Sequence, residues 1–299
     1  MATLDATPTP APSSTPTPAG RAATTRTWLS VPRNRTWALL GTISVLLVAA
    51  VFVLPAITPY GGTEVINGQQ LKGPSWDHWF GTDINQMDVF SRVLGAVKVD
   101  VGISLISTLA AFALGFPLGI LSGYYSGRIA QLLLRVLDMI QAFPVLVLAL
   151  AIVALTGNGS TNVIYAQIFV ATPIMIRVIR SVVVRLREER FIEASIATGN
   201  GDTRLLWRHI APHALPTALI QSTLLMAGAL ILTTGLSFVG VGVHPPQPEW
   251  GSMVGLGSRD IANGEWWTIA FPGLAIALTV FLFNYIGVLL RRQFPEAGH

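Results

Sequence analysis

Residues 139–176 read MIQAFPVLVLALAIVALTGNGSTNVIYAQIFVATPIMI, a run that contains no Asp, Glu, Lys or Arg. A helix needs about 20 apolar residues to cross the hydrocarbon core of a bilayer, so this run is too long for one crossing. Gly157, Asn158, Gly159 and Ser160 interrupt it with residues that favour turns. The stretch therefore predicts two membrane-spanning helices joined by a tight turn.

Four more uncharged segments flank this pair, at residues 37–56, 101–127, 214–248 and 266–290. The chain is 52% hydrophobic and 11% charged, whereas soluble domains carry about 25% charged residues. Lipid must therefore cover surface that a soluble protein would cover with charge. We predict an all-α integral membrane protein with six transmembrane helices. Cleavage of the first segment as a signal peptide is the alternative, but its apolar run exceeds the usual core of about 7–15 residues.

The predicted membrane domain extends over residues 28–292. Residues 1–27 are rich in Thr, Pro, Ala and Ser and have no apolar period, which predicts a disordered cytoplasmic tail. Residues 293–299 form a short cytoplasmic C-terminal tail in this interpretation. Within the domain, residues 57–98 carry the turn-forming and charged residues of an extramembrane connection, with a short helix expected around residues 87–97.

The segment at residues 101–127 has glycines at a regular spacing. Gly115, Gly119 and Gly123 are four residues apart and lie on one face of a helix. This spacing indicates a close backbone approach to another membrane helix.

Lys and Arg indicate the orientation of the chain. With the N-terminus on the inner side, only Lys72, Arg92, Lys98 and Arg259 of the 19 Lys and Arg residues fall in outer segments. Cytoplasmic segments carry an excess of these residues, so both termini are predicted to be cytoplasmic. This topology accounts for the net charge of +4 without any nucleic-acid partner.

Several kinds of chemistry lack the residues that they need. The chain has no Cys, and Lys72 and Lys98 are its only lysines, neither within the Gly-Lys-Ser or Gly-Lys-Thr of a phosphate-binding loop. His209 and His213 have the spacing of helical metal ligands, but Pro212 lies between them and no third ligand is near. No plausible nucleophile and base are paired. We therefore predict no catalytic residues, no metal site and no ATPase site in this chain.

Asp138 is the main charged residue inside a predicted span. A local ion pair with Arg135, three residues earlier, is the structural interpretation. A gating or substrate-binding role for the Arg135 and Asp138 pair is the alternative. Asn284, in the last span, is more typical of contacts between helices than of solute binding.

The long inner loop at residues 185–216 carries the most informative pattern. Residues 185–199 read RLREERFIEASIATG, a charged and helix-favouring stretch whose Gly199 can supply a left-handed stop. Asp202 is expected to cap a second short helix that Pro212 ends. A basic helical hairpin in the cytoplasm either lies on anionic lipid or docks a soluble partner.

At these residues the chain resembles the inner-membrane permeases of bacterial ABC importers, whose cytoplasmic loop has a Glu-Ala-Ala, Gly and Ile-x-Pro pattern. Here the pattern is Glu193-Ala194-Ser195, Gly199 and Ile210-Ala211-Pro212. Ser195 stands where a second Ala is usual, and Ala211 where Leu is usual, both small changes.

The resemblance is closest to the second, C-type subunit of the dipeptide, oligopeptide and nickel permease family, and covers about residues 35–292. The supporting segments are HWFGTD at residues 78–83, DVFSR at 88–92, GLSFVG at 235–240 and PPQPEWG at 245–251.

This resemblance implies a type I ABC importer permease fold in the bacterial inner membrane. The segment from Glu193 to Gly199 would be the coupling helix that enters a groove of a cytoplasmic ATPase subunit. Two ATPase subunits or domains, which hold ATP and Mg, and a second permease subunit are the implied partners. A heterodimer is expected and a homodimer stays open.

Pro245, Pro246 and Trp250 would lie near the outer mouth and contact an extracytoplasmic solute-binding protein, although Trp250 could instead be an interfacial anchor. Peptides are the expected solutes, with nickel or another small solute as the alternative. An ion-coupled carrier and a non-transporting membrane scaffold are the competing classes of function.

Overall fold

The computed structural model describes residues 42, 49 and 52–294, all of which belong to one compact unit, Arg33–His299. The predicted tail at residues 1–27 and most of the predicted span at residues 37–56 lie outside the described residues. The six-helix count therefore stays a prediction. Within the described residues the chain is helical, and its only β feature is an isolated bridge between Thr82 and Asp88.

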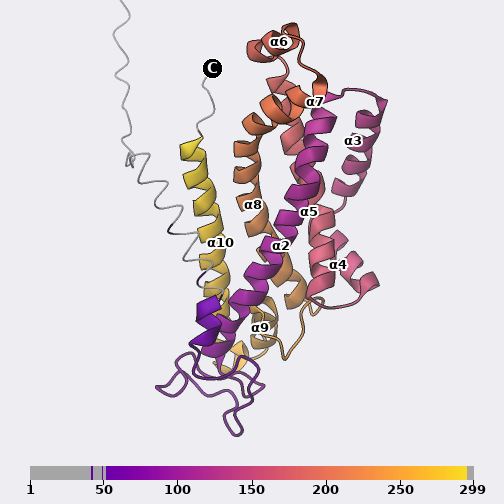
Figure 1. Cartoon of the computed structure of the whole chain (residues 1–299). Coiled ribbons are helices and arrows are strands. Elements are labelled where there is room, and N and C mark those ends of the chain that lie inside the picture. Colours follow the sequence, from indigo (N-terminus) through magenta and orange to yellow (C-terminus); the bar gives the residue numbers. More distant parts are fainter. Residues whose placement is uncertain (1–41, 43–48, 50–51, 295–299) are drawn as a thin grey trace, which may run out of the picture. The chain divides into compact units, whose positions relative to one another are not determined.

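Figure 1 shows the order of the helices along the chain. The elements are η1 (Leu54–Ala56), α2 (Val89–Tyr124), α3 (Arg128–Gln141), α4 (Val145–Thr156), α5 (Ser160–Leu186), α6 (Arg190–Ala197), α7 (Asp202–Leu205), η2 (Leu206–Ile210), α8 (Ala211–Phe238), α9 (Trp250–Gly257), η3 (Ile261–Asn263) and α10 (Trp267–Gln293).

Four helical segments of the described chain are long and apolar enough to cross a membrane. They are Val89–Tyr124, Ser160–Leu186, Asp202–Phe238 and Trp267–Gln293. The pair α3 and α4 passes the same test together but is bent by 88°. This confirms the all-α membrane class and gives four or five spans among the described residues.

The bend between α3 and α4 corrects the prediction of a regular third span. Pro144 has no N–H to donate and disfavours a helical conformation at Phe143, so the helix breaks there. The 12 residues of α4 extend about 18 Å, too little to cross the membrane alone. The predicted turn between α4 and α5 is confirmed, with Gly157 and Gly159 at φ of +98° and +128°.

Two segments that the sequence predicted as separate helices are one helix in the structure. The short helix expected around residues 87–97 and the span at residues 101–127 form one continuous helix, α2, of 36 residues. The side chain of Asp88 caps its N-terminus by accepting a hydrogen bond from the Ser91 N–H at 2.8 Å. At about 1.5 Å per residue α2 is long enough to extend beyond the hydrocarbon core.

The predicted stop at Gly199 is confirmed, but the second helix of the hairpin does not end at Pro212. Gly199 has φ of +80° after α6. Pro212 lies in the first turn of α8, directly after the π-helical turn η2, and the segment from Asp202 to Phe238 stays helical. Because the wider turn changes the bonding register, with Ala211 N–H bonded to Leu206 O, the chain accommodates a proline there.

The predicted glycine stripe lies against α5. A Cβ atom added at Gly115, Gly119 or Gly123 would lie 2.7 Å from the Cβ atom of the residue that faces it. The facing residues are Met175, Ile179 and Val183, respectively. Only glycine permits this approach, and α2 and α5 form the most extensive helix pair of the described chain.

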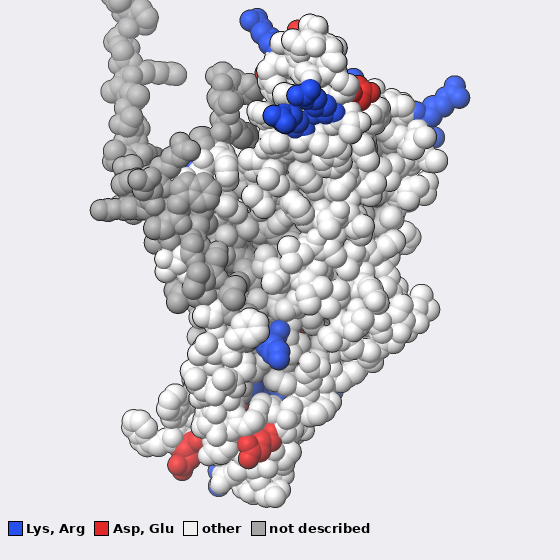
Figure 2. Space-filling model, in the orientation of Figure 1, with Lys and Arg blue, Asp and Glu red and all other residues white. Residues whose placement is uncertain are grey.

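Charged side chains gather at the two ends of the described unit. Figure 2 shows Lys and Arg over the end that carries α6 and α7, and a visible face that is largely uncharged in its middle. This arrangement agrees with a bundle whose middle lies in lipid. The α6 and α7 end is called the inner end below and the opposite end the outer one, following the orientation that the sequence predicts from its Lys and Arg residues.

We expect Gly119→Ala to destabilise the bundle by about 1–3 kcal/mol, because its Cβ atom would overlap Ile179. Gly273→Ala in α10 is the matched control, since nothing lies within 4 Å of its added Cβ atom. Thermal unfolding of both variants in detergent tests this expectation. Equal midpoints for the two variants would contradict the close approach of α2 and α5.

Candidate functional site

The inner hairpin, defined here as residues 188–210, is built on the end of the bundle. Its first helix, α6, follows α5 after a short turn, and its second part, α7 and η2, leads directly into α8. Ile192, Leu205 and Ile210 are buried in one cluster with residues of α5 and α8. The hairpin is therefore packed onto two membrane helices.

The turn at Gly199 is closed by backbone and side-chain hydrogen bonds. The Gly199 N–H donates to Ile196 O at 2.9 Å, which ends α6. The Asn200 side-chain amide donates to the backbone oxygen and to the hydroxyl of Ser195, both at 3.1 Å. Ser195 is buried on the side of α6 that faces the protein, and it thus supports the turn. Asn200 is a structural residue that the sequence did not single out.

The sequence-predicted coupling residues divide into exposed and buried ones. Glu193, Ala194 and Gly199 are exposed, as is Pro212 at the start of α8. Ser195 and Ile210 are buried and hold the hairpin in place. The exposed side also carries three large apolar residues that the sequence did not single out, Phe191, Ile196 and Trp207, which are 38%, 55% and 47% exposed. Exposed apolar side chains beyond the membrane span mark a surface that a partner can cover.

A side-chain tether connects α2 to the hairpin. The Tyr124 hydroxyl, at the end of α2, donates to Asp202 Oδ1 at 2.8 Å. The Arg187 guanidinium lies 5.5 Å from the centre of the same tyrosine ring. The expected side-chain cap by Asp202 is wrong, because α7 has no such bond and this carboxylate binds Tyr124 instead.

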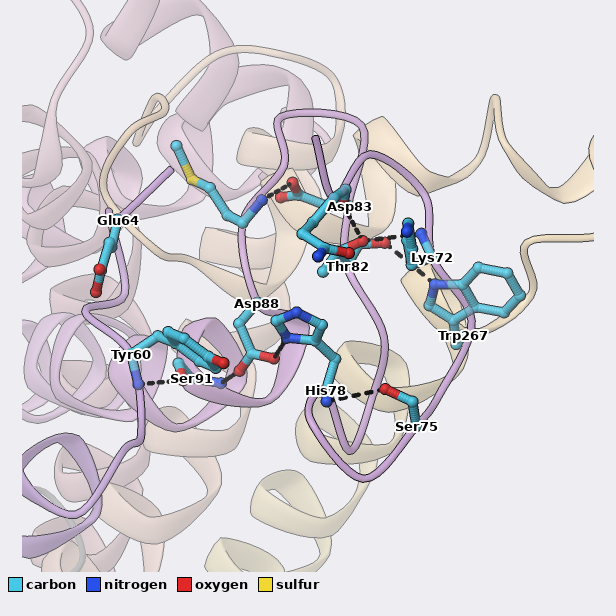
Figure 3. A network of polar contacts seen from close by, with 12 residues as sticks. Tyr60, Glu64, Lys72, Ser75, His78, Thr82, Asp83, Asp88, Ser91 and Trp267 are labelled. Atoms are coloured by element: carbon cyan, nitrogen blue, oxygen red, sulfur yellow. Dashed lines mark hydrogen bonds and ion pairs between the residues drawn. The ribbon is translucent and has the colours of Figure 1, made fainter. Parts of the chain in front are cut away.

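The outer loop, defined here as residues 57–88, is held together by polar contacts (Figure 3). His78 Nδ1 lies 3.0 Å from Asp88 Oδ1, and both side chains are buried. Lys72 N–H donates to Thr82 Oγ1 at 2.8 Å, and the Trp267 indole N–H donates to Thr82 O at 3.2 Å. The predicted family segments in this loop thus serve to fold it and to fix it on α2 and α10.

Arg92 joins the outer loop to the segment before α9. Its buried guanidinium donates to Gly62 O at 3.2 Å and to Pro246 O at 3.3 Å, and its Nε lies 3.4 Å from Asp83 Oδ2. Burial raises the pKa of the Asp83 carboxyl, although the Met87 N–H and Arg92 act in the opposite direction. These contacts join two distant segments, residues 57–92 and 245–250, which are together called the outer platform.

Trp250 lies inside this platform, not on its surface. Its side chain is 1% exposed, its indole N–H donates to Val93 O at 2.9 Å, and its backbone N–H donates to Asp100 Oδ2 at 3.0 Å. Both predicted roles of Trp250, a contact for a binding protein and an interfacial anchor, are therefore wrong. Pro245 and Pro246 are exposed, as expected of a contact surface.

Glu249 shows how the position of Trp250 is fixed. Its carboxylate caps α9 by accepting from the Gly251 and Ser252 N–H groups at 2.9 and 2.6 Å. Burial raises the pKa of this carboxyl. The exposed aromatic residues on the outer side include Trp76, Trp79 and Trp266, at 95%, 59% and 53%.

The predicted local pair of Arg135 with Asp138 is not the one that the structure forms. Asp138 Oδ1 lies 2.6 Å from Arg177 Nη2, so the ion pair joins α3 to α5. Asn284 donates to Val280 O within its own helix. Among the described residues, no group of three or more His, Cys, Asp or Glu side chains could hold a metal ion.

Residues 115–295 match the family described as binding-protein-dependent transport system inner membrane component. The dipeptide transport system permease protein DppC of Alkalihalophilus pseudofirmus is 37% identical over 249 residues, which are 83% of this chain and 81% of that protein. The glutathione transport system permease protein GsiD of Pectobacterium atrosepticum is 33% identical over 265 residues, 88% of each chain.

The fold is also similar to that of a solved structure. A chain of the inward-facing MetNI methionine ABC transporter superimposes with a TM-score of 0.58, covering 69% of this chain and 97% of that one. The two sequences are 16% identical over this region, so this likeness concerns the fold alone.

We expect Tyr124→Phe to loosen the hairpin, because it removes the hydrogen bond to Asp202. A loss of about 1 kcal/mol corresponds to roughly fivefold faster amide hydrogen exchange in the hairpin. Tyr125→Phe removes the same hydroxyl group from the neighbouring exposed residue and serves as the control. Unchanged exchange in Tyr124→Phe would show that the tether does not hold the hairpin.

Proposed function

Because this chain belongs to the family of binding-protein-dependent transport system inner membrane components, we propose that it is a pore-forming subunit of an ABC importer that carries peptides. The observation that supports this most directly is the inner hairpin, which exposes Glu193, Ala194 and Gly199 while its buried residues pack on α5 and α8. A partner that binds this surface can exert a force on it, and the buried residues would pass that force to the membrane helices.

The proposed mechanism is a rigid-body switch between two states. Nucleotide-driven closure of two cytoplasmic ATPase subunits moves the hairpin, which tilts α5 and α8 because it is packed on both. ATP shifts the equilibrium only through its different affinity for the two states. The continuous helical segment from Asp202 to Phe238 connects the hairpin to the outer side of the bundle.

The energy source lies in the partners in this proposal. ATP and Mg bind the ATPase subunits. Lys72 and Lys98 are the only lysines of this chain, and neither lies in a phosphate-binding loop. This chain is then a permease subunit without enzymatic activity of its own, and it needs no bound cofactor. A second permease subunit, most simply a related chain in a heterodimer, completes the pore within the lipid bilayer.

The hairpin end of the bundle faces the cytoplasm in this proposal, with both termini on the same side. The excess of Lys and Arg at that end supports the orientation. The outer platform then faces a solute-binding protein, with Pro245 and Pro246 as exposed contact residues. Its buried network around Arg92 and Asp88 would keep the contact surface rigid.

Peptides are the proposed solutes because of the relatives. The names of the two relatives refer to dipeptide and glutathione transport, and glutathione is itself a small peptide. A binding protein that selects the cargo would set the specificity among peptides.

We expect Gly199→Val to remain inserted in the membrane and to lose ATP-driven uptake. Valine at φ of +80° is strained by about 1–2 kcal/mol or more, which corresponds to roughly tenfold less of the native turn. Gly201→Val is the matched control, because Gly201 has an extended backbone at φ of −70° with nothing within 4 Å of an added Cβ atom. Peptide uptake by the reconstituted importer measures both, and full uptake in Gly199→Val would contradict the role of this turn.

We expect Glu193→Lys to abolish uptake without unfolding the hairpin, because the side chain is exposed and its charge is reversed at the proposed ATPase contact. Glu188→Lys, which reverses an exposed charge just before α6, is the control. Co-purification of the ATPase subunits and peptide-stimulated ATP hydrolysis report the effect. Wild-type hydrolysis and uptake in Glu193→Lys would contradict the proposed docking surface.

A further inference from the structure

The ion pair between α3 and α5 is exposed although it joins two helices of the bundle. Arg177 Nη2 lies 2.6 Å from Asp138 Oδ1, and the two side chains are 49% and 64% exposed. The geometry is that of a charge-assisted hydrogen bond. An ion pair of this kind is ordinary on a surface that faces water, but it is unexpected on one that faces lipid.

The depth of the pair follows from the two helices. Arg177 lies nine residues before Leu186, the inner end of α5, and Asp138 lies ten residues after Arg128, the inner end of α3. At 1.5 Å per residue, both positions are about 14 Å from the inner helix ends. The pair borders the uncharged run at residues 139–176, at the inner edge of the apolar part of the bundle. Charged side chains at this depth face a protein interior or a water-filled cavity.

A polar stripe on α3 leads from the inner end to this pair. Arg128, Gln131, Arg135 and Asp138 follow one another at spacings of three, four and three residues, which places them on one face of the helix. All four are exposed. A face of this polarity is typical of a surface that water reaches, not of one covered by lipid.

The face of α5 that carries Arg177 also lines a cavity. Gln167, Val170 and Ile174 border a cavity of about 240 Å³ between α4, α5 and α8, and Arg177 continues the same face three residues further along. The Gln167 amide donates to Ala229 O at 3.0 Å and so fixes α5 against α8. The cavity and the ion pair thus follow one another along α5, with the pair on the inner side.

We infer that the Asp138 and Arg177 pair lines the solute path and binds solutes that carry both a carboxylate and an ammonium group. This inference rests on the proposed function, because it needs a solute path through the membrane. The Arg177 guanidinium matches a carboxylate in geometry and charge, and the Asp138 carboxylate matches an ammonium group.

The ion pair suits the passage of a solute with two opposite charges. When no solute is present, the two side chains satisfy each other. A zwitterion replaces one ion pair by two, so neither protein charge is left unpaired at membrane depth. A solute with one charge would leave one of the side chains without a partner.

The absence of cysteine from the chain permits a direct test by single-cysteine labelling in vesicles that contain the whole importer. Asp138→Cys leaves the Arg177 charge unpaired, so this cysteine should react faster with an anionic sulfonatoethyl methanethiosulfonate than with its cationic trimethylammonium counterpart. Arg177→Cys should show the opposite preference. We expect a difference of roughly tenfold in each case, as a charged cleft concentrates its counter-ions.

Two further variants test access of water to this face without changing Asp138 or Arg177. Ser181→Cys leaves both charges in place and puts a thiol one turn further inward on the exposed side of α5, where both reagents should reach it. Phe281→Cys on α10 is the lipid-facing control, because Phe281 is 68% exposed about 18 Å from the inner end of an apolar helix. It should react with neither reagent.

Two results would overturn the inference. Cysteines at positions 138, 177 and 181 that react no faster than the one at position 281 would place this face in lipid, and the Ser181→Cys result alone decides this if the other variants fail to insert. The same reagent preference at positions 138 and 177 would exclude charge recognition. ATP-driven peptide uptake by the unmodified importer is measured separately, and its absence would refute the proposed function while leaving the labelling result valid.

Discussion

The close contact between α2 and α5 is the interaction on which the rest of the described structure depends. Gly115, Gly119 and Gly123 bring the two backbones together, and lipid supplies no hydrophobic force that could replace this packing. The outer end of α2 carries the platform residues Asp88 and Arg92, and the inner end of α5 leads into the hairpin. One packed helix pair therefore connects the surface on the outer side with the surface on the inner side.

In both the hairpin and the platform, buried residues hold the exposed residues in position. Ser195 and Ile210 fix the inner hairpin, so that Glu193 and Gly199 can be presented on a rigid support. On the outer side, Trp250 is buried and holds the segment before α9 against α2. Motif residues thus need not all be exposed, because some of them position the exposed ones.

Much of the fold could be predicted from local pattern. The apolar runs gave the membrane class, and the Gly157 and Gly159 turn, the Gly199 stop and the glycine stripe were all confirmed. Two of the errors concern residues whose role depends on distant partners. Asp138 pairs with a residue 39 positions away, and the Trp250 indole binds a carbonyl 157 positions away. Local spacing carries no information about either contact.

The sequence by itself determined the membrane class, the turn positions and the coupling-loop pattern, because each follows from composition or from the backbone preferences of a few adjacent residues. Only the tertiary structure decided which motif residues are exposed and which charge lies opposite Asp138. Those outcomes depend on helix packing, in which one face of each helix is covered and the other is not. Whether Arg177 and Asp138 reach each other is settled by the way α3 lies on α5, which no stretch of neighbouring residues encodes.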